Sequence, residues 1–333
     1  MLDRSSAADY VYAKTSGRLA KSFVGQRANQ LFAVKSLAEL WQLVFNTEVP
    51  MVPEAMLAQK LENDARKRFI QEFCDLLSLF STPDPVALQL LRRFDYSNLK
   101  KINFALRTGQ ASMPQIVDIG KFSSIKYEAW PNVAEMTSGT KLSWFNKPVE
   151  MADVKTFEHN LDVQYVKDLW HVVQNYHGED KTAIEKLISE ELIIDNIVWA
   201  IRLRVYFQMK PEEVISYLAW VTEIGEKSDP IAGPALEILD KSLDTYEDWR
   251  NWRYAKFLNP HEEGVIWNVD PGWIQTSARA AIQRRALQMF HRFPCSPAVL
   301  APWFKIKQQE LDYIRRAAEG LRLNVQVEEM NKY

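Results

Sequence analysis

The residues best placed to do chemistry are five carboxylates close together in the chain. They are Glu237, Asp240, Asp244, Glu247 and Asp248. Residues four apart share one helix face, so a helix here would align Asp240, Asp244 and Asp248 and could hold Mg²⁺ for diphosphate chemistry. Such an enzyme would also need paired aspartates on a second helix, and the chain contains no Asp-Asp dipeptide. The sequence therefore favours a solvated acidic face, with Lys241 and Arg250 nearby.

Other familiar reaction motifs are missing from the sequence. Gly120 and Lys121 precede Phe122, with neither the earlier glycine nor the hydroxyl of a phosphate loop. The chain contains no Gly-x-Gly-x-x-Gly, no Gly-x-Ser-x-Gly and no His-Glu-x-x-His, and its two cysteines, Cys74 and Cys295, do not join a histidine at zinc spacing. His171 and His177 lie six apart, which is poor helical geometry for sharing one metal. We therefore predict no catalytic, cofactor-binding or metal residues, and no enzyme.

The composition points to a helical protein that does not bind nucleic acid. Lys+Arg 41 against Asp+Glu 43 gives a net charge of −2, which removes the diffuse attraction that non-specific nucleic-acid binding needs. Gly 11 and Pro 15 in 333 residues leave few turn residues for an all-β fold. A hydrophobic content of 47% is enough for a large core. The start lacks a secretion signal, and no apolar run approaches the length of a membrane span.

The elements that would position any site are helices. Ser36 and Glu39 have the spacing of a capping box for a helix over 36–47. Apolar residues recur at steps of three and four from Leu61 to Phe80, and the prolines of 81–85 end that helix. Helical patterns return over 162–248 and again over 276–323. Between them we expect two partly irregular excursions, at 110–154, with one or two short strands, and at 249–273.

This pattern predicts four regions. Residues 1–108 form an N-terminal helical lobe, 109–154 an irregular excursion, 155–248 a middle helical lobe, and 249–333 an aromatic excursion with a C-terminal helical lobe. A weak repeat spans the lobes, with a polar residue, an aliphatic residue and then an arginine. Its copies are Asn98-Leu99 to Arg107, Asn196-Ile197 to Arg204, and Tyr313-Ile314 to Arg322. The spacing can also arise by chance in amphipathic helices. If real, it predicts an all-α fold of three pseudo-repeated lobes around an approximate threefold axis.

The C-terminal segment carries a family resemblance. Residues 293–324 resemble the last helix of the C/d subunit family of V-type and archaeal A-type rotary ATPases. The matching residues are Lys307, Glu310, Leu311, Ile314, Arg315, Gly320 and, with a one-residue slip, Arg322. The departures are Gln308, Asp312 and Tyr313.

Two further segments resemble the same family in the right order. Residues 191–214 match through Asn196, Ile197, Arg202 and Arg204, with Asp195 shifted next to the asparagine. The N-terminus is similar through its Tyr-x-Tyr-Ala helix, its Ser-Leu-x-x-Leu helix and the threonine that follows. Together the three motifs span nearly the whole chain.

The resemblance implies a non-catalytic, three-lobed socket without a cofactor. Members sit on the cytoplasmic face of the membrane rotor ring, peripheral to the bilayer, and receive the end of the central shaft. The implied partners are the shaft subunits and the ring, and the implied role is to couple them during proton or sodium transport. A helical adaptor outside the ATPase is the alternative, followed by the Mg²⁺-dependent helical-bundle enzyme.

Five charged residues are candidates for the socket. Lys307 stands in the apolar stripe of the last helix, where a lysine either extends to solvent or pairs with a buried acid. We hypothesise that five residues line or brace the socket between lobes: Arg202, Arg204, Lys307, Glu310 and Arg315. Plain intramolecular ion pairs are the simpler alternative.

Overall fold

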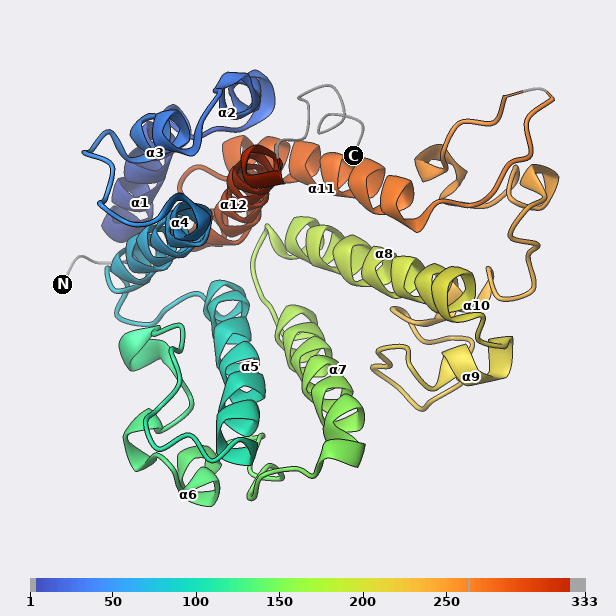
Figure 1. Cartoon of the computed structure of the whole chain (residues 1–333), viewed down its shortest axis with the longest axis horizontal. Coiled ribbons are helices and arrows are strands. Elements are labelled where there is room, and N and C mark those ends of the chain that lie inside the picture. The colour runs from blue at the N-terminus through green and yellow to red at the C-terminus, as the bar shows by residue number, and fades with distance from the viewer. Residues whose placement is uncertain (1–3, 263, 324–333) are drawn as a thin grey trace. The chain divides into compact units, whose positions relative to one another are not determined.

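The computed structural model describes residues 4–262 and 264–323, and within them the chain is all helical, without strands (Figure 1). The fold class is as predicted, but the prediction of short strands within 110–154 is wrong. That excursion instead forms turns, short 3₁₀ helices and α6 (Val133–Thr137). Side chains of α5 (Pro85–Arg107) bond the backbone at Val117, Ser124 and Val149, and local turns bond other backbone groups of the excursion.

The chain divides into two compact units. Unit 1 comprises the residues up to Ala87 and those from Arg279 onward, and unit 2 comprises Leu88 to Ala278. The predicted lobe limits and the threefold repeat stay predictions. Two of those limits, residues 1 and 333, lie outside the described residues.

The longer helices have these bounds. Unit 1 contains α1 (Arg4–Leu19), α2 (Asn29–Ala33), α3 (Leu37–Phe45), α4 (Glu54–Leu77) and α12 (Leu300–Leu323). Unit 2 contains most of α5 (Pro85–Arg107), with α7 (Val154–Gln174), α8 (Lys181–Phe207), α9 (Pro211–Ile215) and α10 (Gly233–Leu236). Helix α11 (Pro271–Arg292) begins in unit 2 and ends in unit 1.

The predicted helix starts and stops of unit 1 are confirmed. Ser36 caps α3 by accepting a hydrogen bond from the backbone N–H of Glu39, and the Glu39 carboxylate accepts one from the N–H of Lys35. Asn46 ends the same helix in a left-handed conformation, which asparagine tolerates better than most residues. Helix α4 ends at Leu77, before the prolines, and α5 begins at Pro85.

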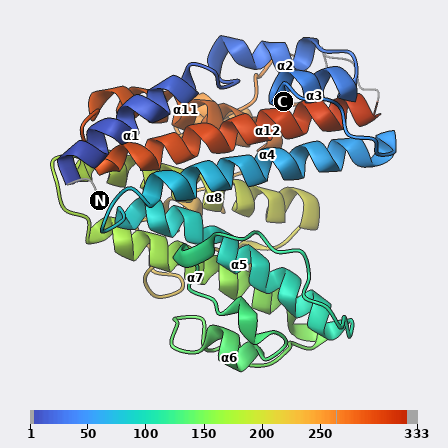
Figure 2. The same ribbon diagram turned by 90° about the vertical axis from the view of Figure 1, so that its left-hand side faces the viewer.

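Helix α12 is the centre of unit 1. Every residue from Leu300 to Lys307 is buried, so this part of the helix is enclosed on all sides. Figure 2 shows α12 between α4 on one side and α2 and α3 on the other, in agreement with its contacts. The ring of Trp303 stacks on Phe73 with centroids 5.9 Å apart. Phe69 and Phe304 complete this cluster of four rings.

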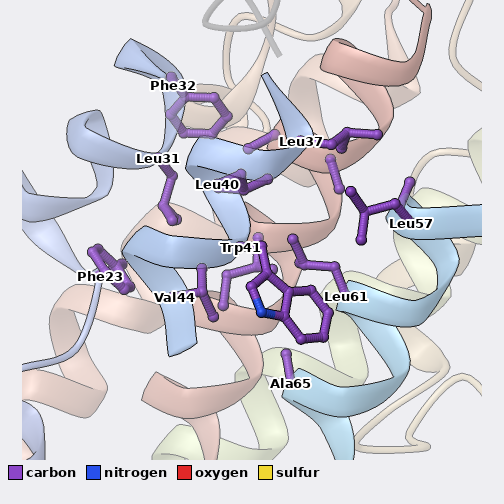
Figure 3. Packing of buried hydrophobic residues seen from close by; sticks show 14 residues of the cluster. Phe23, Leu31, Phe32, Leu37, Leu40, Trp41, Val44, Leu57, Leu61 and Ala65 are labelled. Carbon is purple, nitrogen blue, oxygen red and sulfur yellow. The ribbon is translucent and has the colours of Figure 1, made fainter. Parts of the chain in front are cut away.

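A second apolar cluster of unit 1 joins α12 to the N-terminal helices. Figure 3 shows Trp41 of α3 beside Leu61 and Ala65 of α4, with Leu31 and Phe32 of α2 nearby. The Trp41 indole N–H, which would be costly to bury without a partner, donates to Thr47 Oγ1 at 3.2 Å. The two clusters fix α12 along most of its length, because burying each large side chain stabilises the fold by about 2–3 kcal/mol.

In unit 2, buried polar side chains of α5 hold the excursion 110–154. The Asp95 carboxylate accepts hydrogen bonds from the Ser123 hydroxyl, the Ser124 backbone N–H and hydroxyl, and the Tyr127 hydroxyl. Burial raises the pKa of the Asp95 carboxyl, and these donors oppose the shift. Asn103 accepts a bond from the Val149 N–H at 2.9 Å. The excursion is therefore tied to α5 at residues 123–127 and again at Val149, close to its C-terminal end.

The second irregular segment is longer than predicted. The helical pattern expected up to Asp248 stops at α9, and the described residues of 216–270 form only α10, short 3₁₀ helices and turns. Asp229 organises the turn by accepting from the N–H groups of Val221, Thr222, Ile231 and Ala232. Burial raises the pKa of Asp229, but these donors outweigh it and hold the pKa below its usual range. Such local bonds compete with helix formation.

Two asparagines of the predicted repeat make the same contact. Asn98 Nδ2 donates to the Val117 carbonyl at 2.8 Å, and its Oδ1 accepts from the Val117 N–H at 2.9 Å. Asn196 bonds both backbone groups of Ala219 in the same way, at 3.0 and 2.9 Å. Each asparagine therefore clamps the backbone of a later irregular segment onto its own helix. In the third copy, the Tyr313 hydroxyl donates to Gln283 Oε1 instead.

We expect Asn98→Ala and Asn196→Ala each to lower the free energy of unfolding by about 2 kcal/mol, because each substitution leaves one backbone N–H and one carbonyl without their hydrogen-bond partner. Urea unfolding followed by circular dichroism measures the loss. Asn160→Ala on the exposed face of α7 is the matched control and should change stability by about 0.5 kcal/mol or less. Equal stabilities for all three variants would show that the clamps contribute nothing.

Candidate functional site

The acidic series 237–248 does not form the helix face that Mg²⁺ binding would require. Helix α10 ends at Leu236, and only Tyr246–Asp248 form a 3₁₀ turn. The carboxylates have local partners instead: Asp244 accepts from the Ser242 hydroxyl, Asp248 from the Ser242 N–H, and Glu247 pairs with Arg250. Serine and threonine hydroxyls in this stretch favour such turns over a helix. Across the described residues, no group of three or more histidine, cysteine or acidic side chains is placed to hold a metal.

Lys307 and Glu310 come together as a buried ion pair within α12. Both residues are less than one-tenth exposed, and Lys307 Nζ contacts Glu310 Oε2. Lys307 also donates to the Ser22 hydroxyl at 3.2 Å, while Glu310 Oε1 accepts from the Phe23 N–H at 2.8 Å. The pair therefore bonds the segment that follows α1, which lies almost three hundred positions away in sequence.

This arrangement stabilises the interior of unit 1. Taking two charges out of water is costly, and the pair persists because further hydrogen bonds satisfy it. Ser22 and Phe23 lie between α1 and the 3₁₀ turn Gly25–Ala28, where the backbone N–H of Phe23 has no helical partner. The pair thus fixes the path of the chain from α1 to α2.

Arg315 lies on the same helix but outside this pair. It is about half exposed and contacts Asp312 at 3.3 Å, and Asp312 also pairs with Arg279 of α11 at 3.5 Å. One carboxylate therefore faces two guanidinium groups. Arg315 can contact a partner without disturbing the core, since its bond to Asp312 is a surface ion pair.

Arg202 and Arg204 belong to unit 2 and brace its irregular parts. Arg202 Nη2 donates to Gln275 Oε1 of α11 at 2.8 Å. Arg204 donates to the carbonyls of Ile238 and Lys241 at 2.6 and 2.8 Å, so it holds the turns that follow α10 against α8. Burial lowers the pKa of the Arg204 guanidinium, and the nearby Asp240 opposes the shift.

Unit 2 also carries an open pocket of about 430 Å³ beside α7. The negative charge of Asp168 in its lining is balanced by Lys141, which pairs with it at 2.8 Å. The Asp168 carboxylate also accepts hydrogen bonds from Tyr96 and Gln164. The remaining lining residues are Lys167, Trp170, His171, Gln174 and Val221. The Asp168 contacts join α5, α7 and the excursion, and this is a structural role.

Sequence reasoning found the charges but missed their partners. Ser22 and the Phe23 backbone carry no pattern that points to α12. Asn98 and Asn196 did carry a signal, as poor helix formers at matching places in a repeat, and the structure shows what they bond. Asp229 carried no such signal, because it follows Glu226, Lys227 and Ser228 in a polar stretch of the sequence.

Comparison with known proteins identifies the family. A family model described as ATP synthase (C/AC39) subunit matches residues 11–333, nearly the whole chain. The chain belongs to this family. The resemblance drawn from the three motifs is therefore confirmed, and the chain is a member of a non-catalytic subunit family of V-type rotary ATPases.

A bacterial relative has a similar sequence over nearly its full length. A protein of Treponema pallidum (strain Nichols), described as "Uncharacterized protein", is 27% identical over 318 residues, which cover 96% of this chain and 93% of that protein. In the part of the chain that the structure describes, no helix is both long and apolar enough to cross a bilayer.

We expect Lys307→Met to destabilise unit 1 by about 3 kcal/mol, because it leaves the Glu310 carboxylate buried without its countercharge. The double variant Lys307→Met/Glu310→Gln should recover most of the loss, since no charge remains and the glutamine oxygen still accepts from Phe23. Urea unfolding of the single and double variants measures this coupling. Glu319→Gln, which breaks the exposed pair with Arg322, is the control and should cost about 1 kcal/mol or less. Equal losses in single and double variants would contradict the ion-pair account.

Proposed function

We propose that this protein is the central-stalk subunit that couples the rotating shaft of a V/A-type ATPase to its membrane rotor ring, for proton or sodium transport. The observation that supports the proposal is the match of the ATP synthase (C/AC39) subunit family over residues 11–333. Torque made by ATP hydrolysis elsewhere in the complex passes through the protein to the ring, or returns from it. On this proposal the protein lies on the cytoplasmic face, peripheral to the membrane through the complex.

The internal bracing of each unit supports a mechanical role. A part that transmits torque has to resist deformation, and irregular segments are its weakest elements because they lack a continuous hydrogen-bond ladder. Here Asn98, Asn196 and Arg204 bond such segments to long helices, and the Lys307–Glu310 pair fixes the chain after α1. We propose that Arg202, Arg204, Lys307 and Glu310 brace the socket and that Arg315 faces a partner.

Affinity purification tests this function. Tagged full-length protein expressed in its own organism should capture both the shaft subunits and the rotor ring from solubilised membranes, as identified by mass spectrometry. Reproducible capture of neither would leave the alternative of a helical adaptor outside the ATPase and would reject the central-stalk role. The same preparation without the tag gives the background.

Arg315 provides a residue-level test. Arg315→Gln should weaken capture of the shaft or ring by about fivefold while leaving the thermal unfolding temperature unchanged, because the pair with Asp312 is exposed. Arg250→Gln is matched, since Arg250 is also an exposed arginine paired with an acid three residues away. If both variants capture partners equally well, Arg315 is not a contact residue.

A further inference from the structure

The two units carry opposite net charges. Over the described residues, unit 1 contains nineteen Lys and Arg residues against twelve Asp and Glu, whereas unit 2 contains twenty-one against twenty-seven. The excess in unit 1 comes from two stretches without an acid: residues 10–38 contain five basic residues, and residues 279–309 contain six. The near-zero charge of the whole chain therefore hides a basic part of unit 1.

Helix α1 and its C-terminal end gather part of this charge on one side. Lys14, Arg18 and Lys21 follow one another at steps of four and three, which places them on one helix face. The Arg27 guanidinium donates to the Ala20 carbonyl at 2.9 Å, so it lies beside Lys21. Cations at a helix C-terminus are favoured by the helix dipole. This explains why like charges are tolerated so close together.

Helix α11 brings further basic residues next to α1. The ring centroids of Tyr12 and Phe290 are 5.4 Å apart, which places α1 against the second half of α11, and Figure 2 shows the two helices side by side. Arg284 and Arg292 belong to this half, and both are exposed. They are eight positions apart, about two turns, so they share one face of the helix.

We call Lys14, Lys21, Arg27, Arg284 and Arg292 the basic surface. In the part of the chain that the structure describes, none of the five has an ion-pair partner. Three of them lie over the ring of a nearby aromatic residue instead, with the cation 5.4–5.8 Å from the ring centroid. Such contacts orient the cations without neutralising them.

Nearby acids reduce the charge of the basic surface but do not cancel it. Asp9 lies on α1, and Glu72 and Asp75 lie one turn apart on α4, where Glu72 is paired with Arg18 at 3.8 Å. Glu310 is buried and already paired within α12. When the first three acids are set against Arg18 and the five cations of the basic surface, three positive charges remain. The excess therefore persists with its surroundings counted.

The side chains around these cations favour an anionic lipid surface over a protein partner. A protein interface depends on large apolar anchors, and Tyr10 is the one large apolar side chain of α1 that is more than a third exposed among its described residues. The other exposed apolar residues along this part of α1 are small, namely Ala13, Gly17 and Ala20. Lipid headgroups diffuse laterally, so they can match cations at irregular spacing, and a basic cluster is attracted by the negative potential of an anionic leaflet.

We propose that the basic surface binds the anionic headgroups of a membrane directly. The arginines bond phosphate oxygens in pairs, and the lysines add positive charge at the lipid surface. This goes beyond the proposed central-stalk role, in which the protein is held at the membrane through the complex, and it does not require that role.

Co-sedimentation of the full-length protein with vesicles tests the proposal. The wild-type protein should bind vesicles of phosphatidylcholine with phosphatidylglycerol about tenfold more tightly than vesicles of phosphatidylcholine alone. Salt at about 0.5 M should remove this difference, because the contact is electrostatic. Equal binding to both kinds of vesicle at low salt would overturn the proposal.

A double variant locates the contact. Lys21→Gln/Arg284→Gln removes one cation from each side of the basic surface and should weaken binding to the mixed vesicles about tenfold. Lys155→Gln/Lys186→Gln is the matched control, because it removes the same charge from exposed lysines of unit 2, and it should bind like the wild type. An equal loss in both variants would show that overall charge, and not this surface, determines binding. Unchanged melting temperatures establish that each variant is folded.

The outcomes separate this proposal from the central-stalk role. Capture of the shaft and ring without vesicle binding rejects the lipid contact and leaves the role standing, and vesicle binding without capture does the reverse. If the wild-type protein ignores vesicles while Lys21→Gln/Arg284→Gln loses capture of the shaft or ring, the basic surface contacts an acidic protein and the lipid partner is wrong.

Discussion

Backbone amides and carbonyls that leave a helix need new partners, and in unit 2 the long helices supply them through polar side chains. Two irregular segments, 110–153 and 216–270, lie outside the long helices, and their described residues include no strand that could bond their backbone. Asn98 and Asn196 each take both the donor and the acceptor of one peptide position. An amide side chain suits this role, because it offers one donor and one acceptor in a plane, as a neighbouring strand would.

Unit 1 meets the same requirement at a smaller scale with charges. The Phe23 N–H needs a partner after α1, and Glu310 provides it from α12. Lys307 then neutralises the carboxylate, which lets both charges remain inside a helix whose first two turns are mostly apolar. An ionised acceptor bonds an amide more strongly than a neutral one does, and this helps to explain why a costly buried pair is retained in a well-packed core.

Local features of the fold were predictable, because they depend on near neighbours in sequence. Ser36 with Glu39 predicted the start of α3, and the prolines after residue 81 predicted the break between α4 and α5. The helix expected over the acidic series 237–248 was wrong. The spacing of the acids fits a helix, but the hydroxyls of Ser242 and Thr245 donate competing turn bonds to Asp244. Periodicity alone cannot weigh these alternatives.

The candidate residues, in turn, were predictable in identity but not in role. Lys307 in an apolar stripe indicated a buried pair or an extended lysine, and the geometry selects the pair. Its contact with Ser22 joins positions 285 residues apart, and no local pattern encodes that.

The same physical logic bears on torque transmission in the proposed role. A helix is stiff along its axis, whereas an irregular loop deforms at low cost unless bonds at intervals hold it to a stiffer element. In unit 2 such bonds recur along both irregular segments, from Asp95 and Asn103 on α5 and from Asn196 and Arg204 on α8. Irregular backbone can present varied side chains to partners, and helical anchors keep those side chains in fixed positions. A coupling subunit needs both properties at once, and long helices with internal polar residues supply them without a sheet.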